Sequence, residues 1–263
     1  MCRILVASGN VDAAKMLENI TLMAKDENSL HEMNQKEGSG SWKHQDGWGV
    51  AYLDQKGDFI IQKSPQAIFE DPKVQKLDKL NTNLLIAHVR RKAGSDISLK
   101  NTHPFKARHP ALGECIFCHN GVIKEDIIFD QQYRPQGKTD SERLFYSILS
   151  DITENKDSKI ASAIQKNLQR YAKTRGTNIV LATKEKTYVA MRKNCLPKYY
   201  GMRLGQGKDF MLISSEKLKT FPGISWTSIL PGDVVTIQNG TTAFSISKEK
   251  RSLLQRITTL IKK

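Results

Sequence analysis

The sequence predicts an α+β protein, in which many β-strands are flanked by a few helices. Short apolar runs bounded by turn residues recur along the chain, for example at residues 3–7, 83–89 and 178–183, and runs of this length indicate strands. Apolar residues at helical spacing cover residues 11–25 and 158–171 instead. No linker rich in proline, glycine and serine divides the chain, and no internal repeat is found. The strands and helices are therefore expected to form one domain of mixed class.

The first half of the chain alternates strands with loops. Residues 34–46 are polar and contain glycines, which indicates a loop. An apolar run follows at residues 46–53, entered through glycines, and a turn at residues 55–58 joins it to a returning run at residues 59–63. This pattern predicts a hairpin. A further apolar run at residues 114–119 predicts a strand that ends at an Asn-Gly pair.

The second half begins with a helix start signal at residues 139–142. The order Thr-Asp-Ser-Glu fits a capping box, in which the threonine and the glutamate satisfy free backbone N–H groups at the helix N-terminus. Strands are expected after it, at residues 178–183, 188–192, 210–214 and 234–238. We expect a single domain over residues 1–263 that finishes in a basic, amphipathic helix at about residues 247–263.

Composition narrows the classes of protein to which the chain can belong. It has 263 residues, 39% hydrophobic and 26% charged, no apolar run near the length of a membrane span and no N-terminal signal peptide. The four cysteines are therefore expected to be reduced thiols in a cytoplasmic protein that does not contact a membrane. The formal net charge is +14, but aromatic residues are not interleaved with the basic ones. A nucleic-acid partner is therefore not expected.

Cys2 directly follows Met1 and precedes the first expected strand. Removal of Met1 is expected because the second residue is small. Cys2 then carries both a thiol and a free α-amine, whose pKa of about 7.7–8.0 leaves a useful neutral fraction near pH 7. Such a residue combines a nucleophile with its own base. Position 2 also fits an ordinary buried strand start, so other motifs must decide between these interpretations.

Polar groups at the ends of three other segments suit the recognition of an amino acid. Asn120 and Gly121 can supply a side-chain N–H and a backbone N–H to a tetrahedral oxyanion, although Asn-Gly is also a common turn. Arg90 can hold a carboxylate through two parallel hydrogen bonds, or it can be a surface charge. Asp140 can pair with a substrate ammonium group, or it can simply favour a helix N-terminus.

Six motifs of the chain stand in the order found in one enzyme family. They are Cys2 after Met1, Asp46-Gly47-Trp48-Gly49, His88-Val89-Arg90, Asn101-Thr102-His103-Pro104-Phe105, His119-Asn120-Gly121 and Thr139-Asp140-Ser141-Glu142. With them, the chain resembles the class II glutamine amidotransferases, which belong to the N-terminal nucleophile hydrolases. The motifs span residues 2 to about 145, and the later strand pairs fit the second half of the family more loosely. The resemblance implies a four-layer αββα sandwich.

The resemblance also implies a reaction and a role for each matching residue. Glutamine would be hydrolysed through a γ-glutamyl thioester on Cys2, with release of ammonia and glutamate. Asn120 and Gly121 would form the oxyanion hole, and the α-amine of Cys2 would be the base, since no histidine in the motifs must lie beside it. Arg90 would hold the substrate α-carboxylate and Asp140 its α-amino group.

Trp48 and Gly47 would shape the wall of the same pocket. Family members often carry Thr or Ser a few residues after the arginine, where this chain has Arg-Lys-Ala-Gly. Ser95 or backbone groups are expected to supply that contact. The Cys-Ile-Phe-Cys-His run at residues 115–119 matches a haem-attachment pattern, but no export signal accompanies it and no second ligand pair has zinc spacing. We expect neither a metal nor another cofactor.

Three functions remain open at this point. The first is a glutaminase whose ammonia passes to a separate synthase subunit or is simply released. The second is a hydrolase of larger γ-glutamyl amides or peptides, which would use the same Arg90 and Asp140. The third, of another class, is a non-catalytic module that senses glutamine or binds a polyanion. The intact Cys2, Asn120 and Gly121 favour an enzyme.

Overall fold

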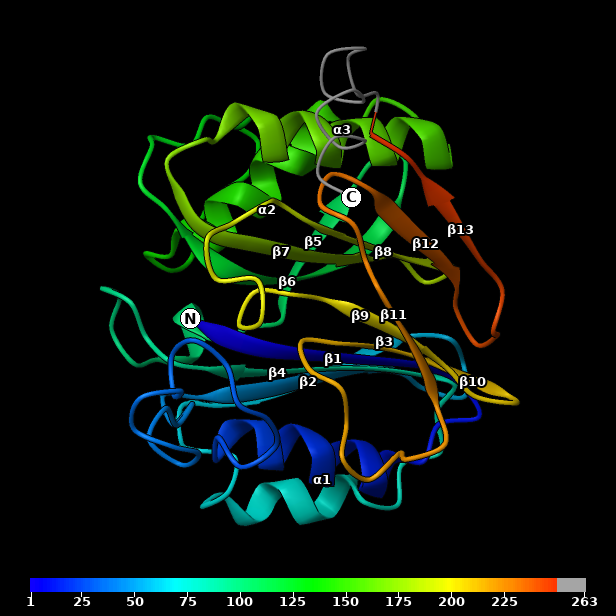
Figure 1. The fold of residues 1–263 in the computed structure, drawn as a ribbon. Helices are drawn as coiled ribbons and strands as arrows, with labels where there is room; N and C mark the ends of the chain where they lie inside the picture. Colours follow the sequence, from blue (N-terminus) through cyan, green and yellow to red (C-terminus); the bar gives the residue numbers. More distant parts are fainter. Residues whose placement is uncertain (250–263) are drawn as a thin grey trace, which may run out of the picture.

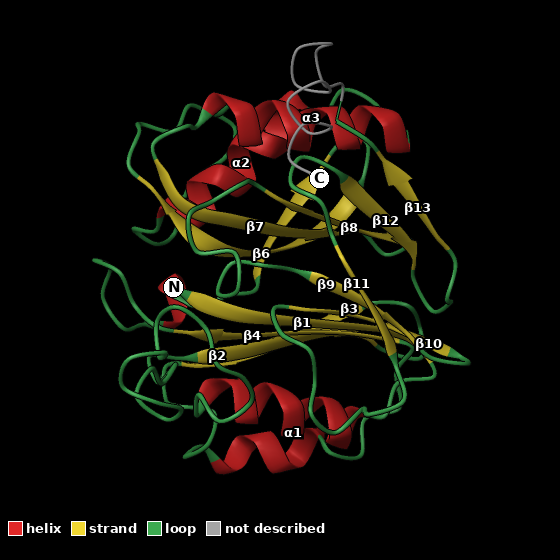
Figure 2. Ribbon diagram, in the orientation of Figure 1, coloured by secondary structure: helices red, strands yellow, loops and turns green. Residues whose placement is uncertain are grey.

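Two antiparallel β-sheets packed face to face form the centre of the computed structural model, which describes residues 1–249 (Figure 1). Sheet A has seven strands in the order β11-β9-β10-β1-β4-β2-β3, and sheet B has six in the order β13-β12-β8-β7-β6-β5. Helices cover the outer face of each sheet (Figure 2). The four-layer αββα sandwich expected from the resemblance is confirmed. The basic C-terminal helix expected at about residues 247–263 lies almost wholly outside the described residues.

Sheet A carries the N-terminus on a central strand. Its strands are β1 (Cys2–Gly9), β2 (Trp48–Leu53), β3 (Phe59–Ser64), β4 (Leu84–Arg90), β9 (Arg203–Gln206), β10 (Phe210–Ser214) and β11 (Ser225–Ser228). Strand β1 pairs with β4 so that Cys2 lies opposite Arg90 and Ile4 lies opposite His88. The first residue of β1 is therefore paired on the β4 side, whereas the pairing of β1 with β10 begins at Leu5.

Sheet B and the helices complete the layers. The strands are β5 (Phe105–His109), β6 (Gly113–Ile123), β7 (Thr174–Ala182), β8 (Lys186–Met191), β12 (Val234–Gln238) and β13 (Phe244–Ser247). The α-helices are α1 (Ala13–Ala24), α2 (Asp140–Asp151) and α3 (Asp157–Arg170), and the 3₁₀-helices are η1 (Pro72–Leu77) and η2 (Leu99–Asn101). The short strands β5, β9, β11 and β13 were not expected from the sequence. No helix within residues 1–249 is long and apolar enough to cross a membrane.

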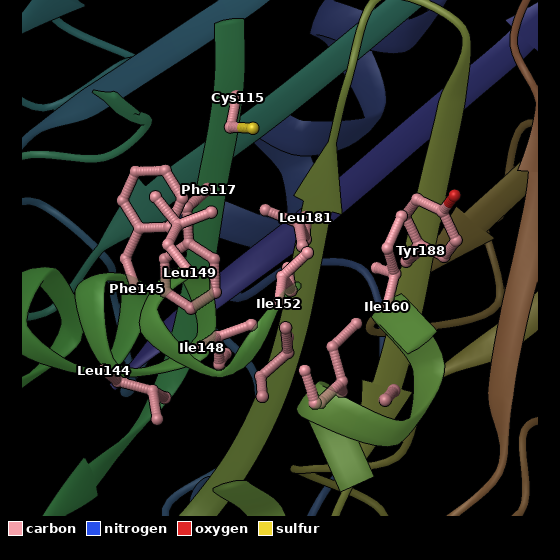
Figure 3. Close-up of a cluster of buried hydrophobic side chains, with 14 of the residues drawn as sticks. Cys115, Phe117, Leu144, Phe145, Ile148, Leu149, Ile152, Ile160, Leu181 and Tyr188 are labelled. Atoms are coloured by element: carbon pink, nitrogen blue, oxygen red, sulfur yellow. The ribbon is translucent and has the colours of Figure 1, made fainter. Parts of the chain in front are cut away.

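Three apolar layers hold the sandwich together. Ile4, Val180 and their neighbours fill the space between the sheets. A second layer lies between sheet A and α1. The third lies between sheet B and helices α2 and α3, where Phe117 stacks on Phe145 with ring centroids 4.9 Å apart (Figure 3). Because side chains alternate along a strand, each sheet residue faces either a helix layer or the inter-sheet space.

The strand around the Asn-Gly pair differs from its expected form. Strand β6 continues through Asn120 and Gly121 to Ile123, with a register shift after Gly121. The interpretation of Asn-Gly as an ordinary hairpin turn is therefore wrong. Asn120 is instead paired with Asn178 of β7, and that pairing holds it inside sheet B.

The capping box at the start of α2 is only half formed. Thr139 accepts a hydrogen bond from the backbone N–H of Glu142, as expected. The Glu142 carboxylate instead accepts from the backbone N–H groups of Gln136 and Gly137, at 2.9 and 2.8 Å. The glutamate thus fixes the loop that leads into α2, and with it the position of Asp140.

Candidate active site

Cys2 is the first residue of β1 and lies in the space between the two sheets. It alternates with Arg3 and shares its face with Ile4, a member of the inter-sheet core. Its residue is only 6% exposed. Met1 extends the pairing beyond β1, because its carbonyl accepts from the backbone N–H of Arg91 at 2.7 Å. Cleavage after Met1 would free the Cys2 nitrogen at this enclosed position.

Asn120 approaches Cys2 from the opposite sheet. The Cys2 backbone nitrogen donates to Oδ1 of Asn120 over 2.7 Å. The amide Nδ2 of Asn120 is buried and has no hydrogen-bond partner among residues 1–249. Because Oδ1 accepts from the Cys2 nitrogen, the side-chain amide of Asn120 is held in one orientation. Its N–H donors remain free beside Cys2. This arrangement suits a donor to an oxyanion.

Gly121 follows Asn120 at a position that admits no side chain. A Cβ atom there would lie 2.3 Å from the carbonyl oxygen of Gly176 and 2.6 Å from Nε2 of His119. Glycine thus lets β6 and the start of β7 approach closely beside the Cys2–Asn120 pair. The structure brings together the three residues that the sequence analysis assigned to catalysis.

Of the three buried cysteines, Cys2 is the one whose thiol pKa is lowered. Burial by itself raises the pKa of the Cys2 thiol, but the positive N-terminus of Met1 and His88 outweigh it and lower this pKa to about 6. Burial raises the pKa of Cys115 to about 12 and also raises that of Cys118. Because the thiolate is the nucleophile, Cys2 is the reactive thiol of these three.

His88 belongs to a buried histidine cluster that the sequence analysis did not assign to the site. The ring centroids of His88 and His103 lie 4.1 Å apart. Burial lowers the pKa of His103 and brings that of His119 to about 4, so both are neutral near pH 7. The sequence signal was present in His88-Val89-Arg90, since alternation puts His88 on the face of Arg90. Its distance from Cys2 depends on the register between β1 and β4.

Arg90 is held by the segment that follows it. The residue is 3% exposed. Its Nη2 donates to the Ser95 hydroxyl at 2.7 Å and to the Ser95 carbonyl at 3.1 Å, and its Nη1 donates to the carbonyl of Asp96 at 3.2 Å. The Ser95 hydroxyl therefore contacts Arg90, and a contact from this segment to the substrate stays a prediction. These bonds orient the guanidinium next to Cys2, whose charge raises the pKa of Arg90 against the larger opposing effect of burial.

Gly47 and Asp140 lie at two borders of the same region. The carbonyl of Gly47 accepts from the backbone N–H of Arg90 at 2.8 Å, and its φ of +123° favours glycine. Asp140 is the first residue of α2, and its Oδ2 accepts from the backbone N–H of Ile123 at 2.7 Å. Its carboxylate is thereby tied to the end of β6, the strand that carries Asn120.

The side chain of Trp48 lies away from Cys2. Its indole belongs to the layer between sheet A and α1, and its Nε1 donates to Oδ2 of Asp71 at 3.1 Å. The neighbouring Gly49 is the β2 residue opposite His88. The expectation that Trp48 forms part of the pocket wall does not fit this placement, because alternation along β2 turns its side chain to the other face.

Comparisons with known proteins identify the family to which the chain is similar. The model of the family "Glutamine amidotransferases class-II" matches residues 19–197. The "Putative glutamine amidotransferase YafJ" of Escherichia coli K12 is 32% identical over 121 residues, which is 44% of this chain and 46% of that protein. A "Putative glutamine amidotransferase" of Haemophilus influenzae is 29% identical over 221 residues, 75% of this chain and 74% of that protein.

A solved structure has the same fold. It is the glutamine phosphoribosylpyrophosphate amidotransferase from B. subtilis, with a TM-score of 0.64 at 18% identity, and the similarity covers 94% of this chain but only 49% of that one. The match to the E. coli relative likewise spans less than half of its length. Since the family model covers more than half of the residues and the fold agrees, the chain belongs to the class II glutamine amidotransferases.

Proposed function

We propose that the protein hydrolyses the γ-amide of glutamine through a γ-glutamyl thioester on Cys2. The observation that carries this proposal is the hydrogen bond from the Cys2 nitrogen to Oδ1 of Asn120, which leaves Nδ2 free. One side chain thereby orients the nitrogen that serves as base and offers the donor that an oxyanion needs. The products are ammonia and glutamate.

The first half of the reaction forms the thioester. The Cys2 sulfur bonds to the γ-carbonyl carbon while the thiol proton passes to the Cys2 α-amine. Nδ2 of Asn120 and the backbone N–H of Gly121 stabilise the oxyanion. The C–N bond then breaks, and the departing nitrogen takes the proton from the α-ammonium group. His88, which also lowers the thiol pKa, stays in place when Met1 is removed and favours this transfer.

The second half consumes a water molecule. Water attacks the thioester carbon as the α-amine accepts one of its protons, and the same two donors hold the oxyanion. The C–S bond breaks, the sulfur regains the proton, and glutamate leaves. We assign the substrate α-carboxylate to Arg90 and the α-ammonium to Asp140, because both are held by neighbouring backbone groups near Cys2 and Asn120.

The fate of the ammonia belongs to the same proposal. The chain covers about half of the B. subtilis amidotransferase with the same fold. Ammonia released at Cys2 would therefore pass to an acceptor domain or a separate synthase subunit, or leave into solution. A larger γ-glutamyl amide would use the same Arg90 and Asp140, so it serves as the comparison substrate in the tests below.

The test is a pair of changes at the N-terminus. Cys2→Ala removes the nucleophile, and an uncleavable N-terminal extension converts the α-amine into a non-basic amide nitrogen. Both variants should fold normally and lose glutamine hydrolysis, measured as ammonia and glutamate together. The matched control is Cys195→Ala, which removes an exposed thiol and should leave turnover unchanged. An extended protein that hydrolyses glutamine at the normal rate would overturn the N-terminal-nucleophile mechanism.

A further inference from the structure

Asn178 is a polar residue whose burial the proposed reaction does not yet explain. Its residue is 0% exposed, and neither Oδ1 nor Nδ2 has a hydrogen-bond partner in the described part of the chain. It pairs with Asn120 across β6 and β7, so the two amides are neighbours on one face of sheet B. A buried amide with both atoms unpaired costs free energy. Such a group beside a nucleophile is expected to bind a ligand.

Tyr200 presents a second unpaired group in the same region. The residue is 1% exposed, and its hydroxyl has no partner within residues 1–249. Its ring packs on Gly176, where a Cβ atom would lie 2.1 Å from the ring. Burial, the neighbouring Tyr199 and the charge of Cys2 all raise the pKa of Tyr200. Tyr200 therefore remains a neutral phenol close to Cys2.

Asn178 and Arg90 lie on opposite sides of the Cys2–Asn120 pair. In sheet A, β1 lies between β10 and β4, and Arg90 is on β4. In sheet B, β6 lies between β5 and β7, and Asn178 is on β7. The loop that enters β5 contacts the β2–β4 side, since Gly49 abuts the carbonyl of His103. Strand β5 therefore lies on the same side of the Cys2–Asn120 pair as Arg90, and β7 lies on the opposite side.

This geometry has a consequence for the substrate. If Arg90 holds the glutamate end, the bond that breaks at the γ-carbonyl carbon directs its nitrogen toward the side of Asn178 and Tyr200. The departing nitrogen carries two N–H groups and gains a third when the α-ammonium group protonates it. Oδ1 of Asn178 and the hydroxyl oxygen of Tyr200 can each accept one of these N–H groups. An acceptor for the third N–H acts only as the C–N bond breaks, which favours the transition state.

We propose that Asn178 and Tyr200 form the subsite for the leaving nitrogen, and that this enclosed subsite selects a primary amide over a substituted one. The inference rests on the proposed function and names its substrate class. A peptide leaving group would place its carbon atoms against Asn178, Tyr200 and the adjacent Met191. These residues are at most 5% exposed. Glutamine is then the preferred substrate and ammonia the product.

The test uses hydroxylamine as a probe of the leaving-group subsite. An amine that attacks the thioester occupies the place from which ammonia departs: its nitrogen bonds to the carbonyl carbon, the C–S bond breaks, and a proton returns to the sulfur. The measured quantity is the ratio of γ-glutamyl hydroxamate to glutamate formed from glutamine. Tyr200→Phe should lower this ratio about three- to tenfold, as expected for one neutral hydrogen bond, and Asn178→Leu should lower it further.

Two controls separate a binding role from a structural one. Tyr133→Phe removes another buried and unpaired hydroxyl, in the layer between sheet B and α2, and should leave the ratio unchanged. Asn178→Ala adds room, so turnover of γ-glutamyl methylamide relative to glutamine should rise above that of the unaltered protein. Unfolding by urea should show that Tyr200→Phe is as stable as the unaltered protein.

A chloromethyl ketone analogue of glutamine distinguishes the two ways of failing. It carries no leaving nitrogen and should alkylate Cys2 in the unaltered protein and in all these variants alike. If Cys2 is alkylated normally but the variants keep the original hydroxamate ratio and amide preference, the leaving-group assignment is overturned while the proposed function stands. If the unaltered protein neither reacts with the ketone nor hydrolyses glutamine, the proposed function fails and this inference falls with it.

Discussion

At the scale of single residues, one hydrogen bond joins the two strands that carry Cys2 and Asn120. The Cys2 nitrogen and Oδ1 of Asn120 are 2.7 Å apart, although 118 positions separate the residues in the chain. In the proposed reaction this bond gives Asn120 two tasks: its oxygen orients the α-amine that is free after Met1 is removed, and its nitrogen donates to the oxyanion. A change at Asn120 should therefore affect turnover more than substrate binding.

Asn120→Ala should lower kcat about 10²–10³-fold, the usual loss for one oxyanion donor, with a smaller change in KM. Asn120→Asp is the matched variant, because it keeps an acceptor for the Cys2 nitrogen but removes the donor. It should be at least as inactive, since a negative charge then faces the oxyanion. Steady-state glutamine hydrolysis measures both. Normal turnover with weakened binding would instead make Asn120 a substrate-positioning residue.

The thiol of Cys2 should titrate well below an ordinary cysteine. With Met1 in place the pKa is about 6, so the thiolate is present above that pH and is lost as the pH falls through it. In this form of the protein the rate of iodoacetamide alkylation at Cys2 should therefore rise with a midpoint near pH 6 and level off about one pH unit higher. His88→Gln removes a group that lowers this pKa, so the midpoint should move up, toward the ordinary value of about 8.5.

Mass spectrometry of the Cys2 peptide follows this reaction, and Cys195 in the same samples corrects for the reagent. An unchanged midpoint in the His88→Gln protein would leave the positive N-terminus as the main cause of the lowered pKa. In that case His88 would be a structural member of the histidine cluster rather than a partner of the thiol.

At the scale of elements, the site depends on a close contact between β2 and the segment before β5. A Cβ atom at Gly49 would lie 2.1 Å from the carbonyl oxygen of His103 and 2.8 Å from Cδ of Pro104. That segment carries His103, whose ring packs on His88. The absent side chain at Gly49 thus lets the segment with His103 approach β2, where the His103 ring packs on His88.

Gly49→Ala should destabilise the protein by about 1–3 kcal/mol or more, because backbone atoms must shift to admit the methyl group. Catalytic turnover should fall as well, since the shift reaches His88. Urea unfolding and glutamine hydrolysis measure the two effects. The control is Gly223→Ala, where a Cβ atom would meet nothing within 4 Å. Equal stability of the two variants would show that the loop yields without cost.

At the scale of the whole molecule, the sandwich encloses uncharged histidines between its layers. Burial holds the pKa of His103 well below its usual range and that of His119 at about 4, against 6.5 for a free histidine. In the unfolded chain both side chains titrate near 6.5. Between about pH 6.5 and pH 4 the unfolded state therefore binds more protons than the folded state.

Stability should consequently decrease as the pH falls through this window. Each buried histidine contributes at most about 1.4 kcal/mol per pH unit there, and above pH 6.5 its contribution is constant. Urea unfolding at a series of pH values measures the slope. His119→Gln cannot be protonated and should make the slope shallower, whereas an unchanged slope would mean that other groups dominate acid unfolding.

The sequence by itself determined the class of fold and much of the site. Strands with apolar runs and helices with apolar stripes have local patterns that survive in the folded protein, so both were predictable. The proximity of Cys2 to Asn120 and Gly121 was expected from the family resemblance that the ordered motifs carry. The short strands β5, β9, β11 and β13 escaped prediction, because strands of four or five residues are decided by their partners rather than by their own residues.

Only the tertiary structure decided which side chains share the inter-sheet space. The register of β2 decides to which face of sheet A the side chain of Trp48 points, and a shift of one residue would reverse it. His88 meets Cys2 through the register of β1 against β4. Asn178 and Tyr200 come near the Cys2–Asn120 pair, where we propose a subsite, because β7 pairs with β6 and Gly176 leaves room for an aromatic ring. Contacts between strands far apart in sequence carry no local signal, so these residues became visible only after the sheets were assembled.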